Sequence, residues 1–264
     1  MKKVSVTTLR NMKEAGEKIA MLTCYDATFA TILDTAGVDV LLVGDSLGMV
    51  VQGEDSTVSV TLDDMIYHTA IVRQGAARSL VIADMPFMTY ATPEQAMANA
   101  ARLMSEGNAE VVKMEGGEWL ADTVSLLSSR GIPVCAHIGL LPQSVHKLGG
   151  YRVHGRDQAS VKQIMKDALA LEKAGAEMIV IELVTRDLAA EISKAVSIPV
   201  IGIGAGAGCD GQVLVLHDML GIGGRYIKMC KDFMQGNDSI QQAIESYVEE
   251  VRAGTFPAKE HGFD

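Results

Sequence analysis

The fold class is decided by one short stretch, Ala174-Gly175-Ala176-Glu177-Met178-Ile179-Val180-Ile181-Glu182. It follows Ser160–Lys173, where apolar residues recur at the spacing of an amphipathic helix. Glycine at position 175 readily adopts the left-handed backbone conformation that ends a helix. The apolar run Met178–Ile181 does not alternate with polar residues, which is typical of a parallel strand buried on both faces. A helix that returns through glycine to a buried strand is the repeating unit of an α/β fold.

The same unit recurs along the chain. Glycine also follows predicted helices at Gly37, Gly107 and Gly131. The predicted strands are Ile19–Thr23, Val40–Val43, Leu80–Ala83, Glu110–Met114, Pro133–His137, Met178–Ile181, Pro199–Ile203 and Val213–Leu216. The predicted helices are Thr28–Ala36, Leu62–Gln74, Pro93–Ser105, Leu120–Ser129, Ser160–Lys173, Asp187–Ala195 and Ile240–Arg252. Eight strands that alternate with helices favour a (β/α)₈ TIM barrel, of the α/β class, over a doubly wound sheet.

The length of the chain agrees with one such barrel. A TIM barrel typically needs about 250 residues, and this chain has 264, of which 48% are hydrophobic. No linker-like or low-complexity segment divides the sequence, so we predict a single TIM-barrel domain over residues 1–264. Two long loops, 44–61 and 138–159, follow predicted strands at the end of the barrel where active sites are built.

Composition excludes several classes of protein. The net charge of −10 disagrees with the basic surface that nucleic-acid binding requires. The first residues lack the apolar run of a signal peptide, and no apolar stretch reaches the roughly 20 residues that span a bilayer. Cys24, Cys135, Cys209 and Cys230 are far apart, which favours reduced thiols over disulfides or a zinc site. We expect a cytoplasmic protein that binds neither nucleic acid nor membranes.

Acidic residues stand at the ends of three successive predicted strands. Asp45 follows the second strand, Asp84 the third and Glu115 the fourth. These strand ends meet at one mouth of a barrel, where unpaired carboxylates would repel one another unless a cation lay between them. Oxygen ligands suit Mg²⁺, which keeps positions open for water or for a substrate such as a 2-oxo acid. The alternative, that each acid only caps the next helix, explains single positions better than it explains all three.

Three other polar side chains belong to the same predicted mouth. Lys113 alternates with Met114 and should point into the barrel, where nearby acids would keep it protonated; this favours substrate binding over Schiff-base chemistry. Glu182 ends an apolar strand, where burial would raise its pKa toward that of a general base. The alternative for Glu182 is an ion pair with a lysine or arginine. His137 is either a second proton-transfer group or a histidine with a purely structural role.

A glycine-rich segment, Gly202-Ile203-Gly204-Ala205-Gly206, ends the seventh predicted strand. In many barrels the backbone N–H groups of this region bind a phosphate. The glycines could equally permit tight turns or let a substrate approach the backbone closely. The sequence alone leaves these alternatives open.

Further motifs run in order through nearly the whole chain. They are Thr23-Cys24-Tyr25-Asp26, Val43-Gly44-Asp45-Ser46-Leu47-Gly48-Met49, Asp84-Met85-Pro86-Phe87-Met88, Lys113-Met114-Glu115-Gly116-Gly117, His137-Ile138-Gly139-Leu140-Leu141-Pro142-Gln143, Gly149-Gly150-Tyr151-Arg152-Val153, Ile201–Gly206 and Asp210-Gly211-Gln212-Val213. Together they resemble the ketopantoate hydroxymethyltransferase family, within the phosphoenolpyruvate/pyruvate superfamily of TIM barrels.

The resemblance implies a reaction and a set of roles. It implies hydroxymethyl transfer from 5,10-methylenetetrahydrofolate to 3-methyl-2-oxobutanoate with Mg²⁺ bound, the first step of pantothenate synthesis. Asp45 and Asp84 are implied as metal ligands, with Glu115 reaching the metal directly or through water, and Glu182 as the proton acceptor. The implied contacts to the 2-oxo acid are Asp45, Ser46, Asp84 and Lys113. A large homo-oligomer, expected to be a decamer, is also implied.

Two stretches depart from the family pattern. Residues 106–110 look about one residue longer than usual, for which we expect an adjustment at the helix end. Ile227-Lys228-Met229 stands where Pro-(Lys/Arg)-Phe is usual. The nearest rival function is another 2-oxo-acid lyase or mutase of the superfamily, but the Lys-Lys-Cys-Gly-His loop of isocitrate lyase-like members is absent from the sequence. A non-catalytic barrel that binds a phosphorylated ligand would leave the converging carboxylates unexplained.

Overall fold

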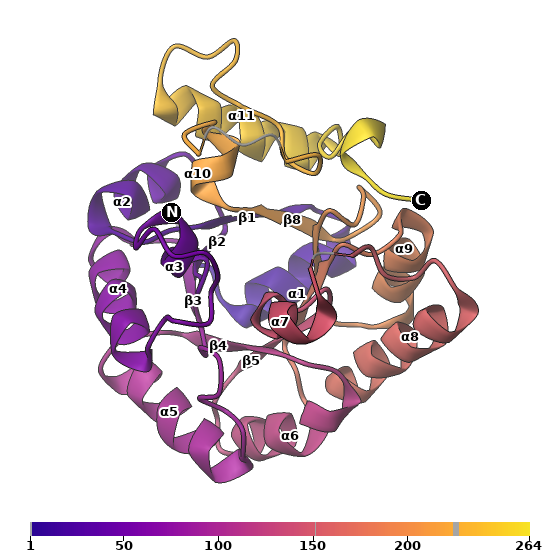
Figure 1. Ribbon diagram of the computed structural model, residues 1–264. Coiled ribbons are helices and arrows are strands. Elements are labelled where there is room, and N and C mark those ends of the chain that lie inside the picture. The colour runs from indigo at the N-terminus through magenta and orange to yellow at the C-terminus, as the bar shows by residue number, and fades with distance from the viewer. Residues whose placement is uncertain (1, 151, 224–226) are drawn as a thin grey trace.

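Eight parallel strands pair in sequence order and close into a barrel (Figure 1). The structure is a computed structural model that describes residues 2–150, 152–223 and 227–264. The strands are β1 Ile19–Thr23, β2 Val40–Val43, β3 Leu80–Asp84, β4 Val111–Glu115, β5 Val134–Gly139, β6 Met178–Glu182, β7 Val200–Ile203 and β8 Gly211–Leu214. The predicted TIM barrel is therefore confirmed.

Helices surround the barrel (Figure 1). The longer ones are α1 Val6–Ala15, α2 Ala27–Thr35, α4 Leu62–Gly75, α5 Pro93–Ser105, α6 Ala121–Ser129, α8 Gln158–Lys173, α9 Arg186–Ala195 and α11 Ile240–Ala253. Three short helices follow strand ends: α3 Leu47–Val50, α7 Val145–Leu148 and α10 Leu216–Met219. Every predicted helix is present, with ends within two residues of the prediction. Among the described helices, none is long and apolar enough to cross a membrane.

Alternation along the strands sorts their side chains into two cores. The apolar side chains that fill the barrel are Ile19, Met21, Val40, Leu42, Leu80, Ile82, Val111, Cys135, Met178, Val180, Ile201 and Val213. Their neighbours along each strand, such as Met114, pack outward against the helices. Asp84, His137 and Glu182 also point into the barrel, because each lies two residues beyond an inward apolar side chain. The two-residue period of the strands therefore places these polar groups inside the barrel at its carboxyl end.

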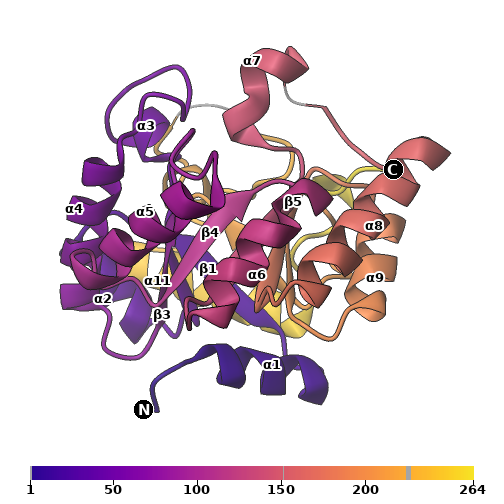
Figure 2. The ribbon, with the colours of Figure 1, turned by 90° about the horizontal axis from the view of Figure 1, so that it is seen from below.

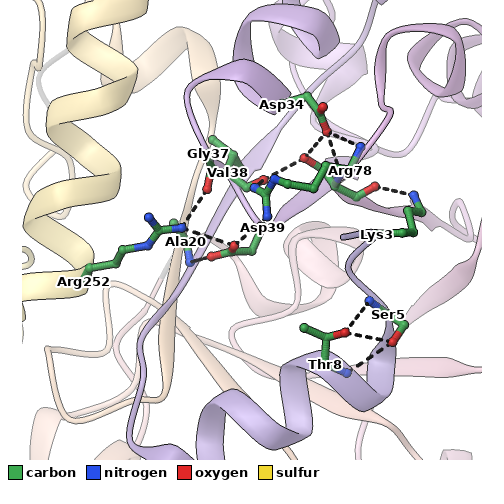
Figure 3. Close-up of polar contacts among 11 residues, drawn as sticks. Lys3, Ser5, Thr8, Ala20, Asp34, Gly37, Val38, Asp39, Arg78 and Arg252 are labelled. Atoms are coloured by element: carbon green, nitrogen blue, oxygen red, sulfur yellow. Dashed lines mark hydrogen bonds and ion pairs between the residues drawn. The ribbon is translucent and has the colours of Figure 1, made fainter. Parts of the chain in front are cut away.

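The amino-terminal end of the barrel is closed by α1, a helix that was not predicted from the sequence (Figure 2). Leu9 of α1 is buried together with the side chains that fill the barrel. Ser5 caps the helix, and its side chain and backbone both bond with Thr8 (Figure 3). Because α1 precedes the first strand, it belongs to no helix–strand repeat that would have pointed to it.

A network of charged groups lies beside the same end (Figure 3). The buried carboxylate of Asp39 accepts a hydrogen bond from the backbone N–H of Ala20 at 3.1 Å. It also pairs with Arg78 at 3.2 Å and with Arg252 at 3.4 Å. Asp34 accepts from the backbone N–H of Arg78 at 2.9 Å. These buried and half-buried acids all have cationic or N–H partners.

Strand ends differ from the prediction by one or two residues in several strands, most clearly in β4, β5 and β8. β4 is shifted by one residue, so Glu115 lies within the strand, and β5 continues two residues past His137. β8 begins at Gly211 rather than Val213. A Cβ at Gly211 would lie 2.4 Å from the carbonyl oxygen of Ile19, so close pairing with β1 requires glycine there. Glycine has low strand propensity, which hid this start of β8 in the sequence.

The predicted glycine helix ends are mostly confirmed. Gly37, Gly131 and Gly175 have φ values of +90°, +80° and +102°. The prediction for Gly107 was wrong, because the left-handed residue after α5 is Asn108, with φ +57°. Asparagine tolerates this conformation better than most residues. The turn after α5 leads into β4, which contains the Lys-x-Glu motif, whereas the adjustment for an additional residue in 106–110 stays a prediction.

Candidate active site

A cavity of about 530 Å³ lies at the carboxyl ends of the strands. Its lining includes every side chain predicted for the site: Asp45, Ser46, Asp84, Lys113, Glu115, His137 and Glu182. The two long loops also contribute, through Thr57 of the first and Pro142 of the second. The structure therefore brings together all the residues that the sequence placed at one mouth.

Strand register sets the neighbours of these side chains. Asp84 is paired with Lys113 across β3 and β4, and Glu115 is paired with His137 across β4 and β5. Lys113 Nζ lies 2.5 Å from Asp84 Oδ1. His137 Nδ1 lies 3.5 Å from Glu115 Oε1, and its Nε2 lies 3.3 Å from Glu182 Oε2. A chain of alternating acids and bases therefore runs around the inside of the barrel mouth.

The buried ammonium group of Lys113 stays protonated. Burial lowers the pKa of this lysine, but the carboxylates of Asp84, Glu115 and Asp45 raise it by more, so that it lies above its usual value. A Schiff base requires a neutral amine. The environment thus supports the predicted role in binding an anionic substrate and disfavours imine chemistry.

Asp45 and Asp84 form the most acidic part of the site. The backbone N–H of Asp45 donates to Asp84 Oδ2 at 3.0 Å, which holds the two residues together. Burial, followed by the charges of Asp84 and Glu115, raises the pKa of Asp45 well above its usual value. Asp45 is not a helix cap: Ser46 holds that position before α3, and it makes no side-chain capping bond there. The helix-cap alternative is therefore wrong for Asp45.

The donor set suits a hard divalent cation. In the described part of the chain, no three or more His, Cys, Asp or Glu side chains are grouped as a metal site made by protein alone. Mg²⁺ does not require such a group, because one or two carboxylates often hold it while water and substrate complete its shell. Asp45 and Asp84 provide two carboxylates, and burial, followed by the charges of Asp84 and Glu115, raises the pKa of Asp45, so a cation would favour its charged form. The residues present therefore fit Mg²⁺.

Glu115 is held by other partners. Its Oε1 faces His137, and its Oε2 accepts a hydrogen bond from the backbone N–H of Gln143 at 3.0 Å. Burial raises its pKa, but His137, Lys113 and the backbone N–H of Gln143 together lower it by more, so the pKa lies below its usual value. This arrangement agrees better with contact to a cation through water than with direct ligation.

His137 lies between two carboxylates. Both ring nitrogens are buried at ion-pair distance from Glu115 and Glu182, although neither contact has hydrogen-bond geometry. Burial and Lys113 lower the pKa of His137, but Glu115 and Glu182 raise it to about 9. Both roles considered for His137, proton transfer and structural support, agree with these contacts, which place its ring between two acids of the site. Among the residues that the structure describes, the ion partner of Glu182 is His137 rather than the lysine or arginine considered from the sequence.

The backbone around Glu182 is tightly constrained. Leu183 has φ +46°, a left-handed conformation that is uncommon for a residue with a side chain and that clusters at functional sites. On the neighbouring strand, Gly139 has φ +90°, and a Cβ there would lie 2.3 Å from the carbonyl oxygen of Glu182. Close approach of β5 to β6 thus fixes the position of this carboxylate.

Gln143 is a site residue that was not predicted. Its Nε2 donates to Asp45 Oδ2 at 2.8 Å, while its backbone N–H holds Glu115. Its Oε1 accepts from the hydroxyl of Tyr90 at 2.5 Å, and both side chains are buried. Gln143 thereby connects two of the predicted carboxylates. The sequence showed it only as the end of a motif in a long loop, where no periodicity indicates the direction of a side chain.

Ser46 lines the cavity next to Asp45. Its Oγ is 2.8 Å from the hydroxyl of Tyr25, and either atom can be the donor. Burial raises the pKa of Tyr25 above its usual value, so the phenol stays neutral. Ser46 therefore retains a neutral hydrogen-bonding partner beside the acidic pair.

Two glycines of the glycine-rich segment allow other side chains of the protein to pack closely against the backbone. Gly204 has φ +63°, and a Cβ there would lie 2.8 Å from Met229 Sδ. Gly206 has φ +80°, and a Cβ there would lie 2.5 Å from Arg186 Cγ. Of the alternatives considered, tight turns with close packing account for these two glycines.

The chain is similar to proteins of one family along nearly its whole length. The family model described as ketopantoate hydroxymethyltransferase matches residues 3–259. The chain is 59% identical over 265 residues to "3-methyl-2-oxobutanoate hydroxymethyltransferase 2" of Pseudomonas entomophila, covering 100% of this chain and 99% of that protein. It is 58% identical to a protein named 3-methyl-2-oxobutanoate hydroxymethyltransferase of Burkholderia thailandensis, covering 98% and 96%.

A solved structure shows the same fold at low sequence identity. Phosphoenolpyruvate phosphomutase from Streptomyces platensis superposes with a TM-score of 0.63 at 14% identity, covering 83% of this chain and 84% of that chain. This likeness concerns the barrel alone. The match along nearly the whole sequence is what identifies the family, and the chain belongs to the ketopantoate hydroxymethyltransferases.

Proposed function

We propose that this protein transfers a hydroxymethyl group from 5,10-methylenetetrahydrofolate to 3-methyl-2-oxobutanoate, giving 2-dehydropantoate (ketopantoate) and tetrahydrofolate. Full-length similarity to proteins that bear the name of this activity supports the proposal. The observation that carries it is the placement of Glu182 on the same cavity as the Asp45–Asp84 pair and protonated Lys113. This set can bind an oxo acid and remove a proton from it.

The chain's own groups can bind the carboxylate and keto oxygens of the 2-oxo acid. The ammonium group of Lys113 provides a fixed positive charge for an anionic oxygen. The hydroxyl of Ser46 lies on the same cavity and can donate to the substrate when Tyr25 donates to it. A cavity of about 530 Å³ falls in the usual range of small-molecule sites and exceeds the size of the oxo acid, which leaves space for the folate.

Asp45 and Asp84 are the residues that would hold Mg²⁺, with Glu115 acting through water. When bound, the cation would polarise the carbonyl group of the oxo acid and stabilise negative charge on its oxygen. Gln143 keeps Asp45 in place by donating to one of its oxygens, and Lys113 does the same for Asp84. Preorganised ligands of this kind lower the cost of assembling the site.

Glu182 is the proposed base. Its carboxylate accepts the proton from C3 of the substrate, and His137 orients it through the contact at 3.3 Å. C3 then forms a bond to the methylene carbon of the folate, and both C–N bonds of that methylene group break. Water supplies the oxygen of the new hydroxymethyl group, while the two folate nitrogens take up the proton removed from C3 and one proton of the water. The apolar lining beside Glu182, which includes Val180 and Leu183, limits access of water to the carbanionic carbon.

We also propose the assembly and location implied by the family resemblance. Phe87, Met88 and Trp119 are exposed around one small surface pocket, and such apolar patches are typical of protein interfaces. This supports a homo-oligomer, which we expect to be a decamer. The four cysteines are free, as in a reducing compartment, which supports a cytoplasmic location.

The decisive experiment is an assay of the purified protein with 3-methyl-2-oxobutanoate and 5,10-methylenetetrahydrofolate. We expect ketopantoate to form only when both substrates are present, and chelation by EDTA to stop the reaction until Mg²⁺ is restored. Omission of folate is the matched control. Cleavage of a 2-oxo acid without folate would instead identify a lyase of the same superfamily and refute the proposal.

A further inference from the structure

Positively charged side chains gather at the rim of the cavity. Arg186 pairs with the carboxylate of Asp264, and Arg156 Nε donates to the main-chain oxygen of the same residue at 3.1 Å. The hydrogen bond from Arg186, with further contributions from Lys259 and Lys228, lowers the pKa of Asp264. Although the chain has a net charge of −10, positive side chains outnumber the one carboxylate in this cluster.

Arg186 is held in place by close packing of its stem. A Cβ at Gly206 would lie 2.5 Å from its Cγ, and a Cβ at Gly262 would lie 2.6 Å from its Cδ. Its backbone N–H donates to the carbonyl oxygen of Phe263 at 3.1 Å. The side chain of Arg186 is 27% exposed, whereas that of its partner Asp264 is 81% exposed. The cation is therefore fixed, and the anion sits on the solvent side, where another carboxylate could replace it.

The cluster adjoins the cavity directly. Lys228 and Phe263 both line the cavity, and Lys228 Nζ lies 4.5 Å from the centre of the Phe263 ring. A ligand whose reacting end lies near Glu182 could therefore extend along this wall and reach the cations at the rim. Exposed ion pairs contribute little to stability, so exchange of one carboxylate for another at Arg186 costs little.

We propose that Arg186, Arg156 and Lys228 bind the glutamyl carboxylates of the folate co-substrate, and that Asp264 occupies this site in the free enzyme. The inference rests on the proposed function, which requires a folate with carboxylates at the end remote from its reacting carbon. Arginine suits carboxylate recognition because its planar guanidinium can donate two parallel hydrogen bonds. Asp264 then acts as an internal competitor that the incoming tail displaces.

Steady-state kinetics with charge-removing variants tests the site. The substrates are 5,10-methylenetetrahydrofolate with one and with three glutamyl residues. Arg186→Gln and Lys228→Gln should each raise KM for the folate about two- to fivefold, with the larger effect on the triglutamate. Asp264→Asn should lower the KM for the folate, because the side-chain carboxylate that competes for Arg186 is gone. Lys166→Gln is the matched control, since it removes a 62% exposed lysine that pairs with Glu118 away from the cavity.

A second readout separates this proposal from the proposed function. Exchange of the C3 proton of 3-methyl-2-oxobutanoate should stay at the wild-type rate in all four variants. Unchanged folate KM values, or a parallel rise in the KM of the oxo acid, would overturn the folate site. If the wild-type protein neither exchanges the C3 proton nor forms ketopantoate, the proposed function itself is overturned.

Inorganic phosphate distinguishes a glutamyl site from a general anion site. If the cluster binds glutamyl carboxylates, phosphate should raise the folate KM of the wild type and have less effect on Arg186→Gln. Phosphate could also raise the folate KM of the wild type while Arg186→Gln has the same folate KM as the wild type in phosphate-free buffer. In that case the cluster binds small anions only, and the proposal fails.

Discussion

The two ends of the barrel handle buried charge in opposite ways. At the amino-terminal end, Asp39 is surrounded by a backbone N–H group and two arginines (Figure 3). At the carboxyl end, Asp45 and Asp84 share a cavity with further acids, while Lys113 and a histidine are the bases that line its inner wall beside them. Fully compensated charge stabilises the fold, whereas an excess of acids over bases, such as the one at the mouth, favours the binding of a cation. The difference separates the end that maintains the barrel from the end that performs chemistry.

The largest effect is expected at the carboxyl end from Glu182→Gln. The substitution preserves shape but removes the base, so C3 proton exchange and ketopantoate formation should fall by a factor of about 10² to 10⁴. Exchange is followed by NMR in deuterated buffer. Binding of the oxo acid and the urea midpoint of unfolding should change little, which serves as the control. Exchange at the wild-type rate would eliminate Glu182 as the base.

At the amino-terminal end, Asp39→Asn should affect stability and leave catalysis intact. The amide cannot neutralise Arg78, whose side chain is 12% exposed, so the free energy of unfolding should fall by about 3 kcal/mol. Urea denaturation measures this loss, and kcat of the folded enzyme should stay at the wild-type value. A large fall in kcat without a fall in stability would show that the two ends are not separated as described.

Asp45→Asn should change stability in the opposite direction from Asp39→Asn, by raising the free energy of unfolding. Because burial raises the pKa of Asp45, its contribution to stability is present below the unfolded-state pKa and is lost as pH rises through the folded-state pKa. Asparagine resembles the neutral form, so the metal-free variant near pH 7 should be more stable by roughly 0.5–2 kcal/mol. It should also lose activity and lose the stabilisation by Mg²⁺ expected of the wild type.

Urea unfolding in EDTA and in Mg²⁺, for both proteins, measures the two effects of Asp45→Asn on stability, and the ketopantoate assay measures the loss of activity. Ser46→Ala is a useful control, because it alters the neighbouring residue without removing a charge. A variant less stable than the wild type in EDTA, or equally stabilised by Mg²⁺, would contradict the assignment of Asp45 to the metal.

The smallest effect is expected from Arg252→Gln. Its side chain is 49% exposed and lies 3.4 Å from Asp39, so the pair should contribute about 0.2–1 kcal/mol and should weaken with salt. A double-mutant cycle with Asp39→Asn measures the coupling between the two residues. Coupling above that range would indicate that the pair behaves as a buried one.

Much of the site could be predicted because the strand period is local. In Val111–Glu115 the alternation of residues alone places Lys113 and Glu115 on the inward face, and the order of strands places them beside Asp84 and His137. The α/β repeat likewise determined the barrel, since each helix–strand unit is encoded by its own residues. The sequence by itself thus determined which polar groups reach the mouth.

Only the tertiary structure decided how those groups interact. Gln143 and Asp45 are 98 positions apart, and Arg186 and Asp264 are 78 apart. Such contacts depend on where loops and chain segments return after the barrel has closed, and no local periodicity encodes that direction. The charge state of His137 depends on two carboxylates from neighbouring strands at once. Sequence pattern specifies the face of an element, whereas distances and charge states arise from packing between distant segments.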